Sequence, residues 1–274
     1  MTVREALAEG TAALEAAGCP SPAVDAEWLL ADVLGTRRSE LHVLDRDLDE
    51  EQAEHYRALV SRRAAREPLA YILGEWGFRR LTLSVDPRVL IPRPETETVV
   101  ERSLALLEGV EDPRVLDVGV GSGAIALALA DERPDVSVVA TDVSTDALEV
   151  AEANRLRAGL NGRVRFVHGD LLAGESGPFD LVVSNPPYVG ADELEALEPE
   201  LLYEPRGALV GVEGHEQVAR AVLPALARGG AIVLEVADRQ APEVAALLQR
   251  LGFAEVRVSE DLAGRERVVE GRRR

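Results

Sequence analysis

The sequence of 274 residues contains no lysine, only one cysteine and few aromatic residues. Cys19 alone cannot form an internal disulfide, and it excludes a metal cluster built from cysteines. No apolar run approaches the roughly 18 residues that a membrane-spanning helix needs. The first ten residues carry acidic side chains and lack the continuous apolar segment of a signal peptide. We therefore expect a cytoplasmic protein with no membrane association.

The charge balance is strongly acidic, because 30 arginines face 49 acidic residues, for a net charge of −19. Such a balance repels a phosphate backbone, so we expect no direct binding of nucleic acid. Arginines do gather at residues 57–66 and at 272–274. We interpret the first group as a solvated helix face and the second as a disordered tail.

The residue pattern divides the chain into three parts. Residues 1–73 show helical periodicity, with no strand signal and no glycine-rich loop, so we expect a small helical bundle with a recognition role. Residues 74–92 hold short alternating runs punctuated by glycine and proline, which predict a β-hairpin linker. Residues 93–274 alternate apolar strands with helices, which predicts an α/β fold with a mainly parallel sheet covered on both faces.

In such folds, ligands bind beyond the carboxyl ends of the strands, and three candidate sites fall there. A glycine-rich loop ends the strand at 115–119 and opens a helix, which permits a tight turn with free N–H donors. The loop comprises Gly119, Val120, Gly121, Ser122 and Gly123. By itself, this loop is equally typical of a plain strand-to-helix turn.

Two aspartates follow the next two predicted strands. Asp142 lies roughly 20 residues beyond the loop, where a carboxylate accepts hydrogen bonds from ribose hydroxyls, although it could instead cap the following helix. Asp170 could accept from an adenine amino group or could simply occupy a turn. Together with the loop, they indicate an adenosine-containing ligand, but they do not separate NAD from S-adenosylmethionine.

The run Asn185-Pro186-Pro187-Tyr188 separates the two cofactors. Its prolines stiffen the end of a predicted strand. Hydride transfer has no use for this run, whereas methyl transfer to a planar nitrogen does, because the Asn185 side-chain oxygen and the Pro186 carbonyl can both accept from an NH₂ group. Two such acceptors orient the nitrogen and stabilise its developing positive charge, and Tyr188 can pack on a planar substrate. The alternative is a rigid connection with Tyr188 in the core.

Metal chemistry has no support in the sequence. The four histidines, His42, His55, His168 and His215, are isolated, and neither a zinc-protease helix nor a nucleophile elbow is present. We expect them to be surface or packing residues, and we expect no metal site.

Nearly from end to end, the chain resembles the HemK/PrmC release-factor glutamine methyltransferases. The resemblance rests on IPRPETE at 91–97, VLDVGVGSGAIALALA at 115–130, FDLVVSNPPYV at 179–189, EPRGALVG at 204–211 and LAGRERVVEGR at 262–272. It departs from the family at Val120, where threonine is common, and at Glu213-Gly214-His215, where Asp-Gly-Leu is usual. Neither departure touches the proposed chemistry.

The resemblance implies the Rossmann-like fold of class I S-adenosylmethionine-dependent methyltransferases, with S-adenosylmethionine as cofactor. It implies that the cofactor lies at Gly119–Gly123, Asp142, Asp170, Leu171 and Asn185. It also implies that Asn185, Pro186, Pro187 and Tyr188 hold the substrate glutamine, with Arg93 as a further candidate. The implied product is N5-methylglutamine in the Gly-Gly-Gln loop of class I peptide chain release factors, which the N-terminal helices help to recognise.

Two other functions stay open. A methyltransferase that modifies adenine N6 or guanine N2 of a nucleic acid would use the same amide chemistry, but the net charge of −19 disfavours it. A non-catalytic module could retain the cofactor pocket for assembly, but the presence of Asn185 and Asp142 disfavours that function. We expect the protein to be a monomer.

Overall fold

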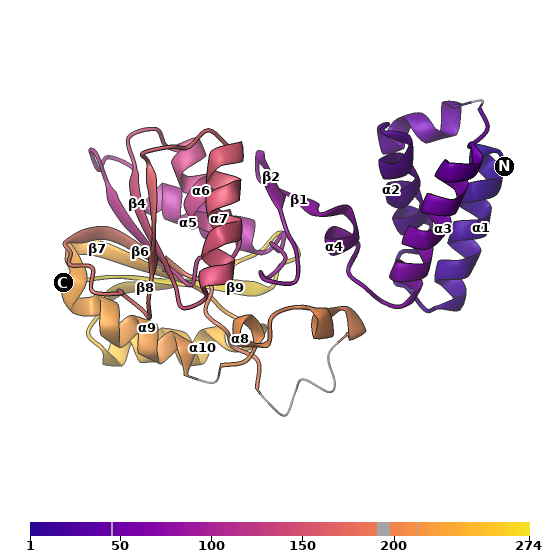
Figure 1. Cartoon of the computed structure of the whole chain (residues 1–274). Coiled ribbons are helices and arrows are strands. Elements are labelled where there is room, and N and C mark those ends of the chain that lie inside the picture. The colour runs from indigo at the N-terminus through magenta and orange to yellow at the C-terminus, as the bar shows by residue number, and fades with distance from the viewer. Residues whose placement is uncertain (45, 191–197, 212) are drawn as a thin grey trace. The chain divides into compact units, whose positions relative to one another are not determined.

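The computed structural model describes residues 1–44, 46–190, 198–211 and 213–274. The chain forms two compact units (Figure 1). The helical unit comprises Met1–Glu75 and Leu197–Tyr203, and the sheet unit comprises Trp76–Ala196 and Glu204–Arg274. Within the described residues, none of the helices combines the length and the apolar character that a membrane crossing requires.

The helical unit packs its helices around one apolar core. Its elements are α1 (Val3–Ala16), α2 (Pro22–Leu34), the 3₁₀ helix η1 (Arg38–Val43), α3 (Glu50–Ala64), α4 (Leu69–Leu73) and the 3₁₀ helix η3 (Pro199–Tyr203). Capping boxes begin α1 at Thr2 and α3 at Asp49, so local side chains satisfy the first helical amides. Leu14, Leu29 and Tyr56 fill the core. The predicted helical character of this region is confirmed.

The prediction that the arginines of residues 57–66 form a solvated helix face was wrong for Arg63 and Arg66, whereas Arg57 and Arg62 are exposed. Arg63 is 5% exposed and its guanidinium pairs with Asp25 at 2.8 Å and with Glu200 at 2.9 Å. Arg66 also pairs with Glu200, at 2.6 Å. The sequence gives no sign of these pairs, because Glu200 lies more than 130 residues beyond its partners along the chain.

The described residues of the sheet unit contain a seven-stranded sheet in the order β5-β4-β3-β6-β7-β9-β8. The first five strands in this order are parallel, and β9 pairs antiparallel with both β7 and β8. Their bounds are β3 (Arg114–Val118), β4 (Ser137–Asp142), β5 (Val164–His168), β6 (Phe179–Ser184), β7 (Leu226–Glu235), β8 (Ala254–Glu260) and β9 (Glu266–Arg272). The α/β prediction is confirmed. The strand order reverses between β3 and β6, which is the position where such folds bind ligands.

Helices cover both faces of this sheet (Figure 1). One apolar core includes residues of α5 (Thr96–Leu106), α6 (Ala124–Glu132) and α7 (Thr145–Arg157). The other includes residues of α9 (Gly214–Val222) and α10 (Ala241–Arg250). Two short elements, α8 (Arg206–Leu209) and the 3₁₀ helix η4 (Leu223–Ala225), lie between β6 and β7 along the chain.

The hairpin is more than a simple linker, and the C-terminal arginines are not a free tail. The predicted hairpin is present as β1 (Glu75–Phe78) and β2 (Leu81–Ser84), but Phe78 and Leu83 are buried in the same apolar core as residues of α5 and α6. The tail prediction was wrong, because Arg272 ends β9 and the Arg273 amide donates to the Gly230 carbonyl at 2.8 Å. From Trp76 on, the hairpin is therefore part of the sheet unit, and so is the C-terminal segment.

Candidate active site

A cavity of about 480 Å³ lies in the sheet unit at the carboxyl ends of β3, β4, β5 and β6. This volume is typical of a site for a small-molecule cofactor. The predicted site residues that line it are Arg93, Gly119, Val120, Gly121, Ser122, Asp142, Asp170, Leu171, Asn185, Pro186 and Pro187. Two predicted residues, Gly123 and Tyr188, are not among the described residues that line the cavity.

The glycines of the loop are required by backbone conformation. Gly119, Gly121 and Gly123 have φ angles of 80°, 53° and 89°, a region that residues with a side chain rarely adopt. A Cβ atom on Gly123 would lie 2.9 Å from a methyl carbon of Leu127 in α6. Gly123 therefore lets the helix pack closely, and this role explains its place outside the cavity wall.

Most amides of this loop are already bonded within the protein, so the prediction of free donors was wrong for them. The amides of Gly119 and Val120 donate to the Thr141 carbonyl at 2.9 and 3.0 Å. The Gly121 amide donates to Asp142, and the Gly123 amide donates to the Val120 carbonyl at 2.9 Å. Among the described residues Gly119–Gly123, only the Ser122 amide donates no hydrogen bond within the protein.

Asp142 links the glycine-rich loop to the turn after β4. Its two carboxylate oxygens accept from the amides of Gly121 and Ser144, each at 2.9 Å. The helix cap of α7 is Ser144, whose hydroxyl oxygen accepts from the Ala147 amide, so capping does not explain Asp142. Because a carboxylate has about four lone-pair sites, Asp142 can still accept from ribose hydroxyls.

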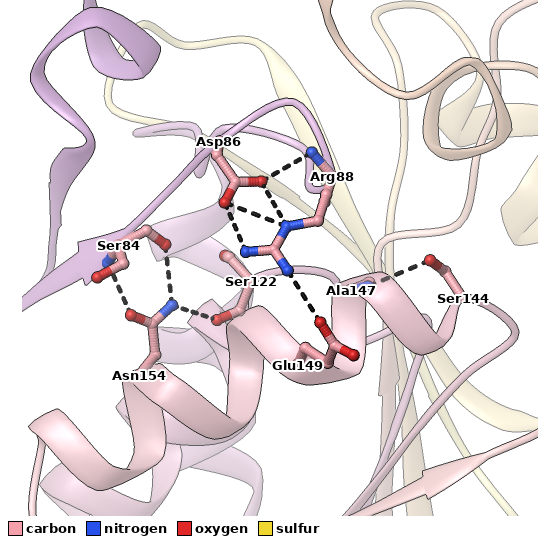
Figure 2. A network of polar contacts seen from close by, with 8 residues as sticks. All are labelled: Ser84, Asp86, Arg88, Ser122, Ser144, Ala147, Glu149 and Asn154. Carbon is pink, nitrogen blue, oxygen red and sulfur yellow. Dashed lines mark hydrogen bonds and ion pairs between the residues drawn. The ribbon is translucent and has the colours of Figure 1, made fainter.

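A network of polar contacts joins α7 and the hairpin to the glycine-rich loop (Figure 2). Asn154 of α7 is 1% exposed, and its Nδ2 donates to the carbonyls of Ser122 at 2.9 Å and Ser84 at 3.0 Å. Its Oδ1 accepts from the Ser84 amide at 2.7 Å. Arg88, which lines the cavity, pairs with Asp86 at 2.7 Å and with Glu149 at 3.0 Å. The network ties the hairpin strand β2 to the glycine-rich loop.

Asp117 is a buried carboxyl just before the loop, and it is not one of the predicted site residues. Its Oδ2 accepts from the Ala126 amide at 3.1 Å, in the first turn of α6. Its Oδ1 has no hydrogen-bond partner in the described part of the chain. Burial raises the pKa of Asp117 to about 7, and the nearby charge of Asp142 adds to the increase. The hydrogen bond from the Ala126 amide acts in the opposite direction and lowers this pKa. A signal for it existed, since Asp117 begins the run Asp-Val-Gly-Val-Gly-Ser-Gly.

Asn185 follows β6 directly and faces the cavity half-buried. The Ser184 hydroxyl anchors the strand end by donating to the Val118 carbonyl at 2.7 Å. No hydrogen bond joins the Asn185 side chain to any residue within the described ranges. An amide that is held at a cavity wall without a partner in those ranges is available to a ligand.

Later glycines leave room for the prolines. A Cβ atom on Gly211 or on Gly214 would lie 2.8 Å from the Pro187 carbonyl oxygen. Gly214 is the middle residue of the Glu213-Gly214-His215 departure and keeps the glycine that Pro187 requires, whereas His215, which the departure changes, stacks on Tyr188 of the motif.

Tyr188 lies against a histidine. Its ring is parallel to that of His215 within 6°, with centroids 6.4 Å apart, and its carbonyl accepts from Gln240 at 3.3 Å. Burial raises the pKa of Tyr188 to about 12, so the phenol is neutral near pH 7. His215 is buried, as expected of a packing histidine, and burial lowers its pKa.

Arg93 is held at the cavity by an ion pair with the buried Glu204, which also accepts from the Ile91 amide at 3.0 Å. Among residues 1–44, 46–190, 198–211 and 213–274, no group of three or more histidine, cysteine, aspartate or glutamate side chains could hold a metal ion.

Comparisons with known proteins agree with this geometry. Residues 5–74 match the family described as "PrmC N-terminal domain", and residues 100–211 match the "Methyltransferase small domain". A protein of Deinococcus radiodurans named "Release factor glutamine methyltransferase" is 46% identical and covers 100% of this chain and 99% of its own length. A protein of the same name from Geobacter sulfurreducens is 41% identical and covers 99% of this chain and 96% of its own length.

A solved structure supports the fold. The T. thermophilus 16S rRNA N2 G1207 methyltransferase, in complex with AdoMet and guanosine, has a TM-score of 0.55 and 21% sequence identity. The match covers 73% of this chain and 50% of that one. The chain therefore has a methyltransferase fold, as predicted.

Proposed function

The chain belongs to the family of release factor glutamine methyltransferases, and on this basis we propose that it methylates the glutamine side-chain amide nitrogen, N5, in the Gly-Gly-Gln motif of class I peptide chain release factors. The methyl donor is S-adenosylmethionine. One observation supports this proposal above the others: the Asn185 amide, which has no partner among the described residues, lines the same cavity as the glycine-rich loop and Asp142.

The cavity residues fit S-adenosylmethionine. The Asp142 carboxylate has lone pairs left for ribose hydroxyls, and Asp170 and Leu171 line the part of the cavity after β5, where an adenine would lie in such a fold. The glycine-rich loop provides a wall without side chains at Gly119 and Gly121. When bound, S-adenosylmethionine supplies a methyl group on a positively charged sulfur.

Asn185 and Pro186 position the substrate nitrogen. An amide nitrogen is a poor nucleophile because its lone pair is delocalised, and it becomes positively charged as it bonds to the methyl carbon. The Asn185 side-chain oxygen and the Pro186 carbonyl can accept its two N–H groups, which orients the nitrogen and favours that charge. Pro187 and the glycines at 211 and 214 keep this geometry fixed before the substrate binds. Tyr188 follows these prolines, and its neutral ring, which stacks with His215, would pack on the planar amide of the substrate.

We propose further that residues 1–73 help to hold the protein substrate and that 93–274 perform the transfer. The helical unit exposes large apolar side chains, including Trp28 at 41% and Val43 at 80%. The Arg38 guanidinium lies 5.3 Å from the centre of the Trp28 ring. Exposed aromatic and arginine side chains of this kind are typical of protein-binding surfaces.

A nucleic-acid substrate is the second candidate, and the charge distribution disfavours it. The net charge is −19, and all four arginines of residues 57–66 are paired with acidic side chains. We propose that the protein works as a monomer without direct contact to nucleic acid.

The test is to incubate the protein with methyl-labelled S-adenosylmethionine and a purified class I release factor, and to locate the label by mass spectrometry. We expect one methyl group on the glutamine of the Gly-Gly-Gln loop, and none on a release factor in which alanine replaces that glutamine. Parallel incubations with ribosomal RNA and tRNA should stay unlabelled. Label on RNA, or a release factor that stays unlabelled, would contradict the proposal.

A further inference from the structure

A buried carboxyl lies beside the Asn185 motif on the neighbouring strand. In the parallel pair of β6 and β7, Ser184 is opposite Leu234, so Glu235, which ends β7, is the next position along and lies beside Asn185. Neighbouring strands are roughly 4.8 Å apart, which places the two residues at one sheet edge. Glu235 is 1% exposed and does not itself line the cavity among the described residues.

Glu235 contacts two parts of the site. Its carboxylate accepts a hydrogen bond from the Thr96 hydroxyl, and Thr96 lines the cavity. Its main-chain carbonyl is 2.8 Å from Nε2 of His215, whose ring stacks with Tyr188. The carboxylate Oε2, however, has no hydrogen-bond partner among the residues that the structure describes. Because unpaired buried oxygens are costly and uncommon, this one calls for a functional reason.

The charge of Glu235 changes in the physiological pH range. Burial raises its pKa to about 7, against the Thr96 hydrogen bond, which lowers it. The charged and titratable groups that face it are Arg267, Glu95, Arg93, His215 and Tyr188. The shifted pKa values of His215 and Tyr188 keep both rings neutral near pH 7.

We propose that ionised Glu235 is a positioning residue for methyl transfer, whose negative charge favours the positive charge that develops on the substrate nitrogen at Asn185. The inference rests on the proposed function. In the step, the nitrogen lone pair forms the N–C bond, and the C–S bond breaks with its electron pair passing to sulfur. The nitrogen then loses one N–H proton to water. Glu235 forms no bond and takes no proton, and it acts through the weakly screening protein interior.

The test is the pH dependence of kcat for the full chain acting on release factor with both substrates saturating. The wild-type kcat should rise with pH through an inflection near 7, because the ionised form is the active one. Glu235→Gln keeps an oxygen for the Thr96 hydroxyl but lacks the charge. Its kcat should be lower on the order of tenfold at pH 8 and within about twofold of the wild type at pH 6. A purely structural defect would lower kcat by one factor at every pH.

Two further variants separate Glu235 from its neighbours. Asp117 also has a pKa of about 7, so Asp117→Asn is the matched control and should retain the inflection. Thr96→Val removes the hydrogen bond that lowers the pKa of Glu235, so its inflection should move to higher pH. This variant tests the inference even if Glu235→Gln does not fold.

An inflection that persists in Glu235→Gln, one that is lost in Asp117→Asn, or one that does not move in Thr96→Val would overturn the inference. A pH-independent wild-type kcat would overturn it as well. In each of these cases the wild type is active, so the proposed function stands. A wild-type protein that does not methylate release factor at any pH would instead refute the proposed function, and the inference with it.

Discussion

Replacing Asp142 with asparagine should weaken the binding of S-adenosylmethionine by roughly 10- to 150-fold. The Asp142 carboxylate accepts from the amides of Gly121 and Ser144, each at 2.9 Å. An asparagine has one acceptor oxygen, so it can keep one of these bonds, and its NH₂ group faces the other donor. The variant also lacks the negative charge that would accept from the ribose hydroxyls, and a hydrogen bond to a charged group contributes about 1.5–3 kcal/mol, which corresponds to that loss of affinity. Asp142→Ala loses both bonds and should bind still more weakly.

The assay is isothermal titration calorimetry with S-adenosylmethionine, and the matched control is Asp180→Asn. Asp180 also accepts a backbone amide at 2.9 Å, from Arg114, but it lies near the start of β6, away from the cavity. The control should change the dissociation constant less than twofold. If Asp142→Asn binds as tightly as the wild type, Asp142 only orders the turn after β4 and does not hold the cofactor.

Three more predictions follow from the structure. Asn185→Ala should lower kcat about 10²- to 10³-fold, while calorimetry shows cofactor affinity changed less than tenfold; near-normal turnover would remove Asn185 from the mechanism. The pKa of Glu235 is raised from 4.5, its ordinary value in the unfolded chain, to about 7 in the folded protein. Between these pH values unfolding releases the Glu235 proton, so the free energy of unfolding of the wild type should fall by about 3 kcal/mol from pH 4.5 to 7. Urea unfolding of Glu235→Gln should lack that part of the slope, and an identical slope would show that Glu235 ionises normally. Trp28→Ala should lower kcat/KM about tenfold on intact release factor but not on a Gly-Gly-Gln peptide, whereas Leu262→Ala, an exposed control in the sheet unit, should affect neither; equal losses on both substrates would exclude Trp28 from recognition.

The parts of the site that could be predicted from the sequence are short and local. The glycine-rich loop, Asp142 and Asn185 each follow an apolar run that forms a parallel strand, and the ends of parallel strands meet at one edge of a sheet. Knowing the strand order was unnecessary for this, because the carboxyl ends of β3 to β6 meet at one edge whichever strands are neighbours. Arg93 was predicted from the family resemblance alone, and the structure places it at the cavity through its pair with Glu204.

The parts that could not be predicted depend on pairings between distant residues. Asn154 bonds to Ser84 and Ser122, which are 70 and 32 residues away, so nothing near it in the sequence distinguishes it from a surface asparagine of a helix. The importance of Glu235 depends on the register of β6 against β7, which apolar runs do not reveal. Tyr188 was predicted to pack on the substrate. Its ring stacks with that of His215, which comes from α9 and is 27 residues further along the chain. That prediction stays to be tested.

The two buried carboxyls connect the stability of the sheet unit with its chemistry. Asp117 and Glu235 lie near the carboxyl ends of β3 and β7, each with an oxygen that has no partner among the described residues, and burial raises the pKa of both to about 7. As the pH rises through 7, each gains a charge that the fold does not compensate, so the sheet unit should become less stable. Of the two, Glu235 is the one that lies beside Asn185, where its negative charge favours the positive charge that develops on the substrate nitrogen. Both Asp117→Asn and Glu235→Gln should therefore stabilise the protein at pH 8, but Glu235→Gln alone should remove the rise of kcat with pH, because polar groups that assist catalysis are often poorly satisfied in the free protein.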